Sequence, residues 1–294
     1  MKEFILSCCS TVDLTDEYLA NRGIVYVGFH YSLGDRIYLD DMGKTMPLSH
    51  FYKEMVNGKM TKTAQVNADE YYAHFEKFAK EGKDVVHVTL SSGISGSYNS
   101  ALIAKRQIEE KYPVKIYVVD SLGASSGYGL LMEYLADLKD EGKSAEEIAL
   151  WAEKNRLRFH HWFFSTDLTF YVRGGRVSKA SGWFGTLLKI CPLLNMNDEG
   201  KLIPRHKIMG KKRVSEVIVE KMLEHAENGA DYDGKCFISH SACESDAMLV
   251  KKLVEEKVPA LKDKVRVFDI GTTIGSHTGP GTVALFFVGD QRTR

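Results

Sequence analysis

Short apolar runs alternate with longer amphipathic segments through the first half of the chain. The runs at 84–90 and 115–120 are mainly apolar, as in strands that are buried on both faces of a parallel sheet. Each run leads into a loop of small residues and then into a helical pattern of apolar positions. This alternation is typical of βαβ units around a mainly parallel sheet. The same patterns predict a strand at 3–9, a hairpin at 24–40, and helices at 15–23, 47–57, 67–80, 98–111, 128–139 and 144–158.

The pattern changes near residue 160, after which strands become more frequent. We therefore expect an α/β fold of two α/β domains, 1–160 and 161–294, the first with a mainly parallel sheet flanked by helices. The chain shows no flexible linker, so the halves should pack closely and form a ligand cleft at the domain junction. Strands are predicted at 161–167, 202–209, 235–241, 265–270 and 282–288, helices at 211–229 and 245–257, loops at 60–66 and 271–281, and an amphipathic segment up to 190.

Composition narrows the possible classes of function. With 294 residues, 44% of them hydrophobic, the chain is long enough for two domains with a substantial core. Its 39 Lys and Arg balance 39 Asp and Glu, whereas a protein that binds a nucleic-acid backbone usually has a strongly basic surface. No apolar run is long enough to span a membrane, and five cysteines, two of them adjacent, argue against a secreted disulfide framework. These features predict a cytoplasmic protein that does not bind nucleic acid.

A loop rich in serine and glycine, 91–97, lies between a predicted buried strand and a helix. Ligands bind at such positions in open α/β sheets, because backbone N–H groups and the helix N-terminus favour negative charge. The loop lacks the lysine and the spacing of a P-loop, which argues against a nucleoside triphosphate. It predicts a site for a carboxylate or a phosphate; the simpler alternative is a tight turn with a capping serine.

Two further glycine-rich segments carry candidate ionisable side chains. His277 lies within Gly275–Gly281, where small neighbours allow a ligand to approach the imidazole closely. Arg176 follows Gly174 and Gly175, so its guanidinium lies beside a flexible backbone and is suited to an oxyanion. The simpler alternatives are a structural histidine and a solvated turn. We expect His277 to titrate near neutrality.

The segment Gly123–Gly127 matches the G-x-S-x-G pattern of serine hydrolases and places Ser125 as the nucleophile. Asp269 and His277 follow it in the order Ser, Asp, His. However, such an elbow should follow its strand directly, and residues 120–122 intervene here. A serine hydrolase that uses Ser125, Asp269 and His277 is therefore the alternative function, and a module that senses small anions is a third.

Spacing along the chain predicts no metal site. Cys236, His240 and Cys243 are close in sequence, but the first two fall on one predicted strand. Strand rise would separate them by about 13 Å, which is too far for one ion.

Five short motifs occur along nearly the whole chain: Lys62–Gln65, Ser92–Tyr98, Val119–Ser121, Gly174–Val177 and Gly275–Gly281. Together they are far more specific than any one of them. In order and separation the set resembles the DegV family of fatty-acid-binding proteins.

The resemblance implies two α/β domains that clasp one long-chain fatty acid, such as palmitate, stearate or oleate. The acyl chain would lie in a buried tunnel covered by the second domain, and the carboxylate would lie at the domain junction. The implied site residues are Thr63, Ser95 and Gly96 at the carboxylate, and Arg176, His277 and Ser121 near the headgroup or an acyl phosphate.

The resemblance also implies a biological context. Members act in lipid transport and fatty acid metabolism as carriers without turnover of their own, and they need no cofactor and no metal. Some present the acid to a separate fatty acid kinase, and transient membrane contact is expected. On this basis we expect that replacing Arg176 or His277 preserves most fatty-acid affinity but prevents phosphorylation.

Three positions depart from the family's pattern. Cys9 stands where the family usually has Asp, and Ala64 stands where it usually has Ser. Both lie in the site region and could alter contacts with the headgroup. Met209 replaces a usual basic residue, a change that bears on the docking of a kinase partner.

Overall fold

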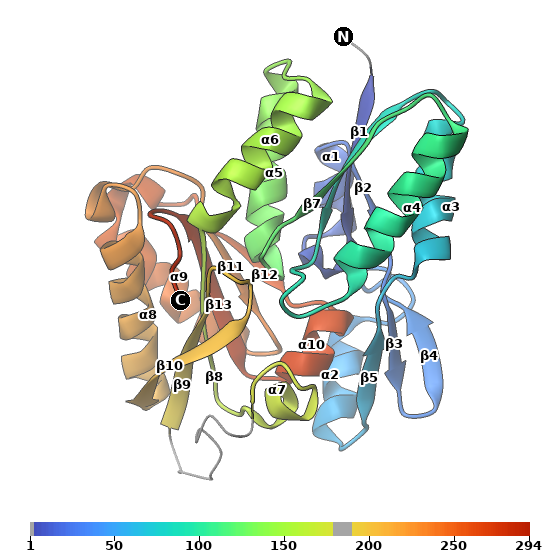
Figure 1. Ribbon diagram of the computed structural model, residues 1–294. Coiled ribbons are helices and arrows are strands. Elements are labelled where there is room, and N and C mark those ends of the chain that lie inside the picture. The colour runs from blue at the N-terminus through green and yellow to red at the C-terminus, as the bar shows by residue number, and fades with distance from the viewer. Residues whose placement is uncertain (1–2, 179–189) are drawn as a thin grey trace.

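A four-stranded parallel sheet organises the first half of the chain (Figure 1). The computed structural model describes residues 3–178 and 190–294. The strand order is β2-β1-β6-β7, with bounds Ile24–Val27, Phe4–Cys9, Asp84–Thr89 and Ile116–Asp120. All pairings in this sheet are parallel, and β6 is buried along its whole length, as its apolar run predicts.

Helices cover both faces of the parallel sheet, as predicted. The four helices are α3 Ala68–Ala79, α4 Ser97–Lys111, α5 Ser126–Asp140 and α6 Ala145–Asn155. The first two pack together on one face, and the other two lie on the opposite face (Figure 1). α3 begins at the predicted capping box: the Glu70 amide donates to Asn67 Oδ1 at 3.0 Å, and the Asn67 amide donates to the Glu70 carboxylate at 2.8 Å.

A six-stranded mixed sheet organises the second half. Its strands are β10 Leu202–Met209, β9 Ile190–Met196, β8 Phe159–Ser165, β13 Thr282–Val288, β11 Phe237–His240 and β12 Arg266–Asp269, in that spatial order. Only the β11–β12 pairing is parallel. Helices α8 (Lys211–His225) and α9 (Glu244–Lys257) pack on the outer face of this sheet (Figure 1).

Helix α5 joins the two sheets, because it contacts β1 on one side and β8, β11 and β13 on the other. One hydrophobic core runs through both sheets. β8, the first strand of the mixed sheet along the chain, begins at Phe159, close to the expected domain boundary. The division into domains 1–160 and 161–294 itself stays a prediction.

A small three-stranded sheet lies beside this junction, next to two short helices (Figure 1). Its strands are β4 Arg36–Leu39, β3 His30–Leu33 and β5 Thr61–Ala64, and the helices are α2 Leu48–Val56 and α10 Thr272–Thr278. α10 contacts both β3 and β5, so a late segment of the chain meets an early one here.

Two predicted loops are regular elements. The prediction of a loop at 60–66 is wrong, because β5 pairs there with β3, a partner nearly thirty positions earlier that produces no local signal. The predicted loop 271–281 contains α10, which the glycines conceal because they lower helix propensity. Gly275 is needed there, since a Cβ at this position would overlap the Tyr52 hydroxyl.

The predicted hairpin at 24–40 is wrong in its first part, because β2 pairs in parallel with β1 and the hairpin consists of β3 and β4 alone. Other differences are smaller. β9 was not predicted, and α8 ends at His225 rather than near Gly229. Most of the amphipathic segment expected before Ile190 lies outside the described residues.

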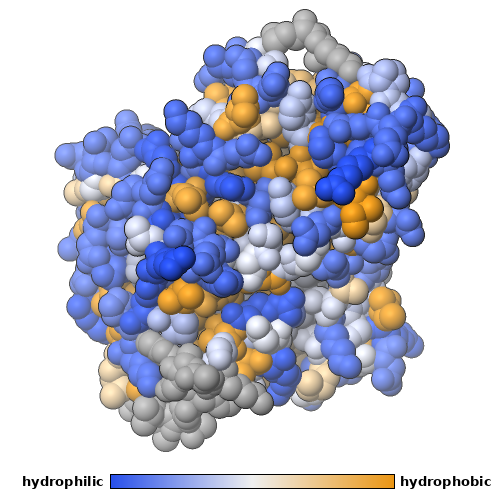
Figure 2. Space-filling model, in the orientation of Figure 1, coloured by the Kyte–Doolittle hydropathy of each residue, from blue (hydrophilic) through white to orange (hydrophobic). Residues whose placement is uncertain are grey.

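The face drawn in Figure 2 is mainly hydrophilic, with hydrophobic side chains in small patches between polar ones. Within residues 3–178 and 190–294, no helix has the length and apolar character needed to cross a bilayer.

Candidate functional site

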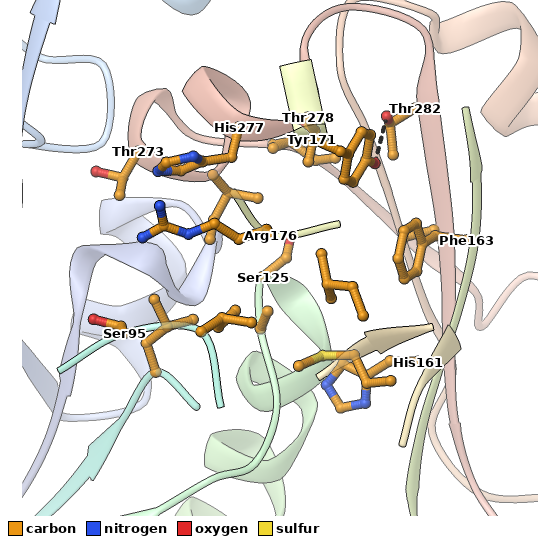
Figure 3. Close-up of a pocket in the computed structure, with 18 of the residues that line it drawn as sticks. Ser95, Ser125, His161, Phe163, Tyr171, Arg176, Thr273, His277, Thr278 and Thr282 are labelled. Atoms are coloured by element: carbon orange, nitrogen blue, oxygen red, sulfur yellow. Dashed lines mark hydrogen bonds between the residues drawn. The ribbon is translucent and has the colours of Figure 1, made fainter. Parts of the chain in front are cut away.

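A cavity of about 500 Å³ lies where the parallel, mixed and small sheets meet. This volume falls within the range of about 300–1,000 Å³ that is usual for small-molecule sites. The wall formed by the mixed sheet is largely apolar, and Phe163 and His161 mark it in Figure 3. Its apolar lining includes Phe163, Met196, Leu202, Ala284 and Phe286.

The opposite wall is polar. Figure 3 shows Ser95, Arg176 and His277 on the side away from Phe163. Thr63 and Gly96 also line the cavity. The structure therefore brings together five of the six predicted site residues, from β5, the loop before α4, the segment after α7 (Thr169–Arg173), and α10.

Ser121, the sixth predicted residue, does not line the cavity. It is buried, and its hydroxyl closes a turn by donating to the Gly123 carbonyl at 3.2 Å and accepting from the Gly123 amide at 3.0 Å. Through these two hydrogen bonds, Ser121 shapes the loop between β7 and α5.

Thr63 and His277 form a pair across the polar wall. The distance between Thr63 Oγ1 and His277 Nε2 is 2.7 Å. Burial and the neighbouring Arg176 guanidinium lower the pKa of His277 to about 4, so the imidazole is neutral near pH 7. The expectation that His277 titrates near neutrality is therefore wrong, because a sequence does not show how deeply a side chain is buried.

A neutral imidazole carries one N–H proton, on either Nδ1 or Nε2. The groups around the His277 ring favour the proton on Nε2. Among the described residues Nδ1 of His277 is buried without a hydrogen-bond partner, and the nearby Arg176 guanidinium disfavours a second N–H that has no acceptor. With the proton on Nε2, His277 donates to Thr63 Oγ1. The Thr63 hydroxyl proton is then free to be donated to a ligand.

Arg176 is half-buried, and burial lowers the pKa of its guanidinium, which nevertheless stays charged near pH 7. Its Nη1 donates to the Gly174 carbonyl at 2.5 Å. Within the described part of the chain, no carboxylate forms an ion pair with it. A partly buried cation without a counter-charge is costly, so the site favours an anionic ligand.

The loop before α4 supplies the remaining polar groups. α4 starts at Ser97 with Gly96 as its N-cap, so the positive end of a 15-residue helix lies at the cavity. The Ser97 amide donates to Ser95 Oγ at 3.2 Å, which leaves the Ser95 hydroxyl proton available to a ligand. Gly96 has no Cβ, which gives the Gln65 amide room to pack against the loop.

The described residues do not assemble the hydrolase triad. Ser125 Oγ donates to Asp13 at 2.5 Å and lies 3.2 Å from Ser239 Oγ. His277 Nε2 is occupied by Thr63, and Asp269 lies beside His240 at 3.6 Å. Ser125 therefore lacks the imidazole base that would make it a nucleophile.

Two buried acids support the wall without lining the cavity, and sequence reasoning missed both. Asp13 accepts from the Gly271 amide at 3.0 Å, and Asp40 accepts from the Thr273 amide at 3.3 Å. Burial raises the pKa of both carboxyls. They fix the start of α10 and so help to position His277. In the sequence, the one local signal for Asp13 is that an acidic residue follows the first predicted strand closely.

The fold and site define an α/β protein with an internal cavity that is largely apolar on one side. On the other side lie hydrogen-bond donors and a guanidinium that has no carboxylate partner in the described part of the chain. The model of the family described as "Uncharacterised protein, DegV family" matches residues 9–290. A DegV domain-containing protein of Clostridium perfringens is 36% identical over 293 residues, 99% of each chain. The "Fatty acid-binding protein" of Thermotoga maritima is 30% identical over 279 residues, 93% of each chain. The chain belongs to the DegV family.

A solved structure agrees with this assignment. It is the fatty-acid-binding DegV family protein of Thermus thermophilus, which is 25% identical to this chain. The two superpose with a TM-score of 0.85 over 99% of this chain and 100% of that one. The α/β fold expected from the sequence is thereby confirmed.

Proposed function

We propose that this protein binds one long-chain fatty acid, with the acyl chain in the cavity and the carboxylate at the polar wall. The observation that carries the proposal is the Arg176 guanidinium, which has no carboxylate partner among the described residues and lies in the polar wall of a cavity whose opposite wall is largely apolar. A ligand that satisfies both features has one anionic group and a long apolar body. The fatty-acid binding named for relatives from Thermotoga maritima and Thermus thermophilus supports the same ligand class.

The energetics favour such a ligand. Each buried CH₂ contributes about 0.8 kcal/mol, so a chain of about 16 carbons gains on the order of 10 kcal/mol before the costs of association. The carboxylate would otherwise be desolvated at a penalty, and the polar wall offsets this penalty with donors. The apolar wall therefore supplies affinity, and the polar wall supplies orientation.

We assign the carboxylate contacts to the Thr63 and Ser95 hydroxyls and to the helix end at Gly96. Arg176 supplies the counter-charge, and His277 acts on the ligand by orienting the Thr63 hydroxyl. An acyl phosphate would bring further oxygens and charge to the same wall, where Arg176 is suited to a second pair of hydrogen bonds.

The finer function follows from the family resemblance. We propose a cytoplasmic carrier in lipid transport or fatty acid metabolism that takes palmitate, stearate or oleate, makes transient contact with membranes, and presents the acid to a fatty acid kinase. It would have no turnover of its own and need no cofactor. The residues 1–160 and 161–294 would form the two domains that enclose the acid.

Mass spectrometry of an organic extract of the purified protein tests the proposal. We expect a fatty acid in near one-to-one ratio with protein. Only trace lipid, together with no uptake of added palmitate or oleate by delipidated protein, would refute it. A fluorophosphonate probe tests the alternative, because labelling of Ser125 would require a hydrolase mechanism.

A further inference from the structure

Two histidines and one aspartate converge on the far side of the mixed sheet, away from the cavity. His160 lies on β8, His225 is the last residue of α8, and Asp290 follows β13. None of the three lines the cavity. Their candidate ligand atoms all lie within 4.8 Å of one another.

The two distances that join the imidazoles to Asp290 are close to those between ligand atoms around a small cation. His160 Nε2 lies 2.9 Å from Asp290 Oδ1, and His225 Nδ1 lies 3.3 Å from Asp290 Oδ2. Ligand atoms around a tetrahedral zinc ion with bonds of about 2.0–2.1 Å are roughly 3.3 Å apart. His160 Nε2 also lies 3.0 Å from the Asp290 carbonyl oxygen, so this nitrogen already faces the aspartate.

The fold holds these side chains in place from several sides. The Asp290 amide donates to the His225 carbonyl at 3.0 Å, which ties the chain after β13 to the end of α8. The His160 ring stacks between His225, at a centroid distance of 5.0 Å, and Phe287, at 5.1 Å. The other neighbour of the His225 ring is Trp162, at 5.8 Å. His160 is held against Phe287, whereas the His225 ring would turn out of its near-parallel stack so that both imidazoles direct their in-plane lone pairs at one ion. The ordering cost of binding a metal would therefore fall mainly on His225.

We propose that His160, His225 and Asp290 form a binding site for a divalent first-row transition cation of the zinc type. Imidazole nitrogens with one carboxylate suit Zn²⁺, Co²⁺ and Ni²⁺ better than Mg²⁺ or Ca²⁺, which prefer oxygen ligands. The Asp290 side chain is 60% exposed, so a coordination position is open to water. The ion would replace the hydrogen bonds between the imidazoles and Asp290 and would fasten the segment after β13 to β8 and α8.

This site could not be predicted from sequence spacing. His160 and His225 are 65 positions apart, and Asp290 follows after as many again, so no local motif marks them. The cluster forms because β8, the end of α8 and the residues after β13 meet at one place on the sheet.

Calorimetric titration of Zn²⁺ into chelator-treated full-length protein tests the site, with Co²⁺ absorption as a second probe. We expect one equivalent to bind. His225→Ala and Asp290→Asn should each weaken binding by roughly tenfold or more, because each removes one of three ligands. His50→Ala, at an exposed histidine on α2, is the matched control and should leave binding unchanged.

These variants avoid the buried His160, so the fold should survive, and thermal melting without metal checks this. Fatty-acid content should not change, which separates this site from the cavity. Failure of the wild type to bind Zn²⁺ and Co²⁺ in the submillimolar range would overturn the proposal. Undiminished binding in both His225→Ala and Asp290→Asn would also overturn it, because the ion would then lie elsewhere.

Discussion

The pairing of Thr63 with His277 makes a quantitative prediction about fatty-acid binding. If His277 acts by orienting the Thr63 hydroxyl, the effects of replacing the two residues should not be additive. The test is a double-mutant cycle of Thr63→Val, His277→Ala and the double variant. Valine keeps the shape of threonine but removes its hydroxyl.

The magnitudes follow from the two hydrogen bonds. A bond from the Thr63 hydroxyl to a carboxylate is worth about 1.5–3 kcal/mol, so Thr63→Val should weaken binding roughly 10- to 150-fold. The 2.7 Å bond between His277 and Thr63 joins neutral groups. Its loss costs about 0.5–1.5 kcal/mol, or roughly 2- to 12-fold in affinity. When Thr63→Val is already present, His277→Ala should have little further effect, and the coupling free energy should equal that of the neutral bond.

Titration calorimetry with palmitate and delipidated protein measures the cycle, and circular dichroism confirms that each variant is folded. Thr61→Val is a matched control, because Thr61 lies on the same strand but bonds to the Ser276 carbonyl and does not line the cavity. Since the pKa of His277 is about 4, the coupling should be the same at about pH 6.5 and about pH 8. Strictly additive losses, or unchanged affinity in Thr63→Val, would refute the reasoning.

Three further predictions concern charge and stability. Arg176 is partly buried with no carboxylate partner among the described residues, so we no longer expect its replacement to preserve most of the fatty-acid affinity. Arg176→Met should weaken palmitate binding at least roughly tenfold by calorimetry, whereas Arg173→Met, an exposed control, should not. Equal effects of the two substitutions would show that no specific cation is needed. Ser7 Oγ lies 2.8 Å from both His74 Nε2 and His87 Nδ1, so Ser7→Ala leaves these buried nitrogens without that partner. The substitution should lower the free energy of unfolding, measured in urea, by about 1–3 kcal/mol, and an unchanged midpoint would contradict this. Burial lowers the pKa of His74 to about 4, below the value of about 6.5 in an unfolded chain. The contribution of His74 to stability is therefore complete above about pH 6.5 and falls as the pH decreases toward 4. The urea midpoint should be lower at about pH 5 than at about pH 7, and this difference should be larger for the wild type than for His74→Gln.

Most of the parallel sheet and its helices could be predicted from the sequence, because their signals are local. The apolar run of β6 and the capping box at Asn67 each depend on residues close together in the chain. β5 and α10 could not be predicted, because their partners lie far away in sequence and their own residues favour other structures. These two elements carry Thr63 and His277, so the least predictable part of the fold holds two of the five predicted site residues that line the cavity.

In the candidate site, too, the features with local signals could be predicted and those set by distant residues could not. Ser95, Gly96 and Arg176 were visible as residues in glycine-rich loops, and they line the cavity. The protonation state of His277 was not visible, because it depends on burial and on a guanidinium about a hundred positions earlier. Ser121 belongs to a family motif, but the structure uses it to build the turn before α5.

The charge balance of the polar wall explains why a neutral histidine fits this site. A fatty acid brings one negative charge, and Arg176 supplies one positive charge. A protonated His277 would add a second cation, which would itself be costly to bury beside Arg176. The neutral imidazole avoids that cost and still contributes a donor through Thr63. The site thus matches the charge of the proposed ligand, while the hydroxyls of Thr63 and Ser95 would provide direction without further charge.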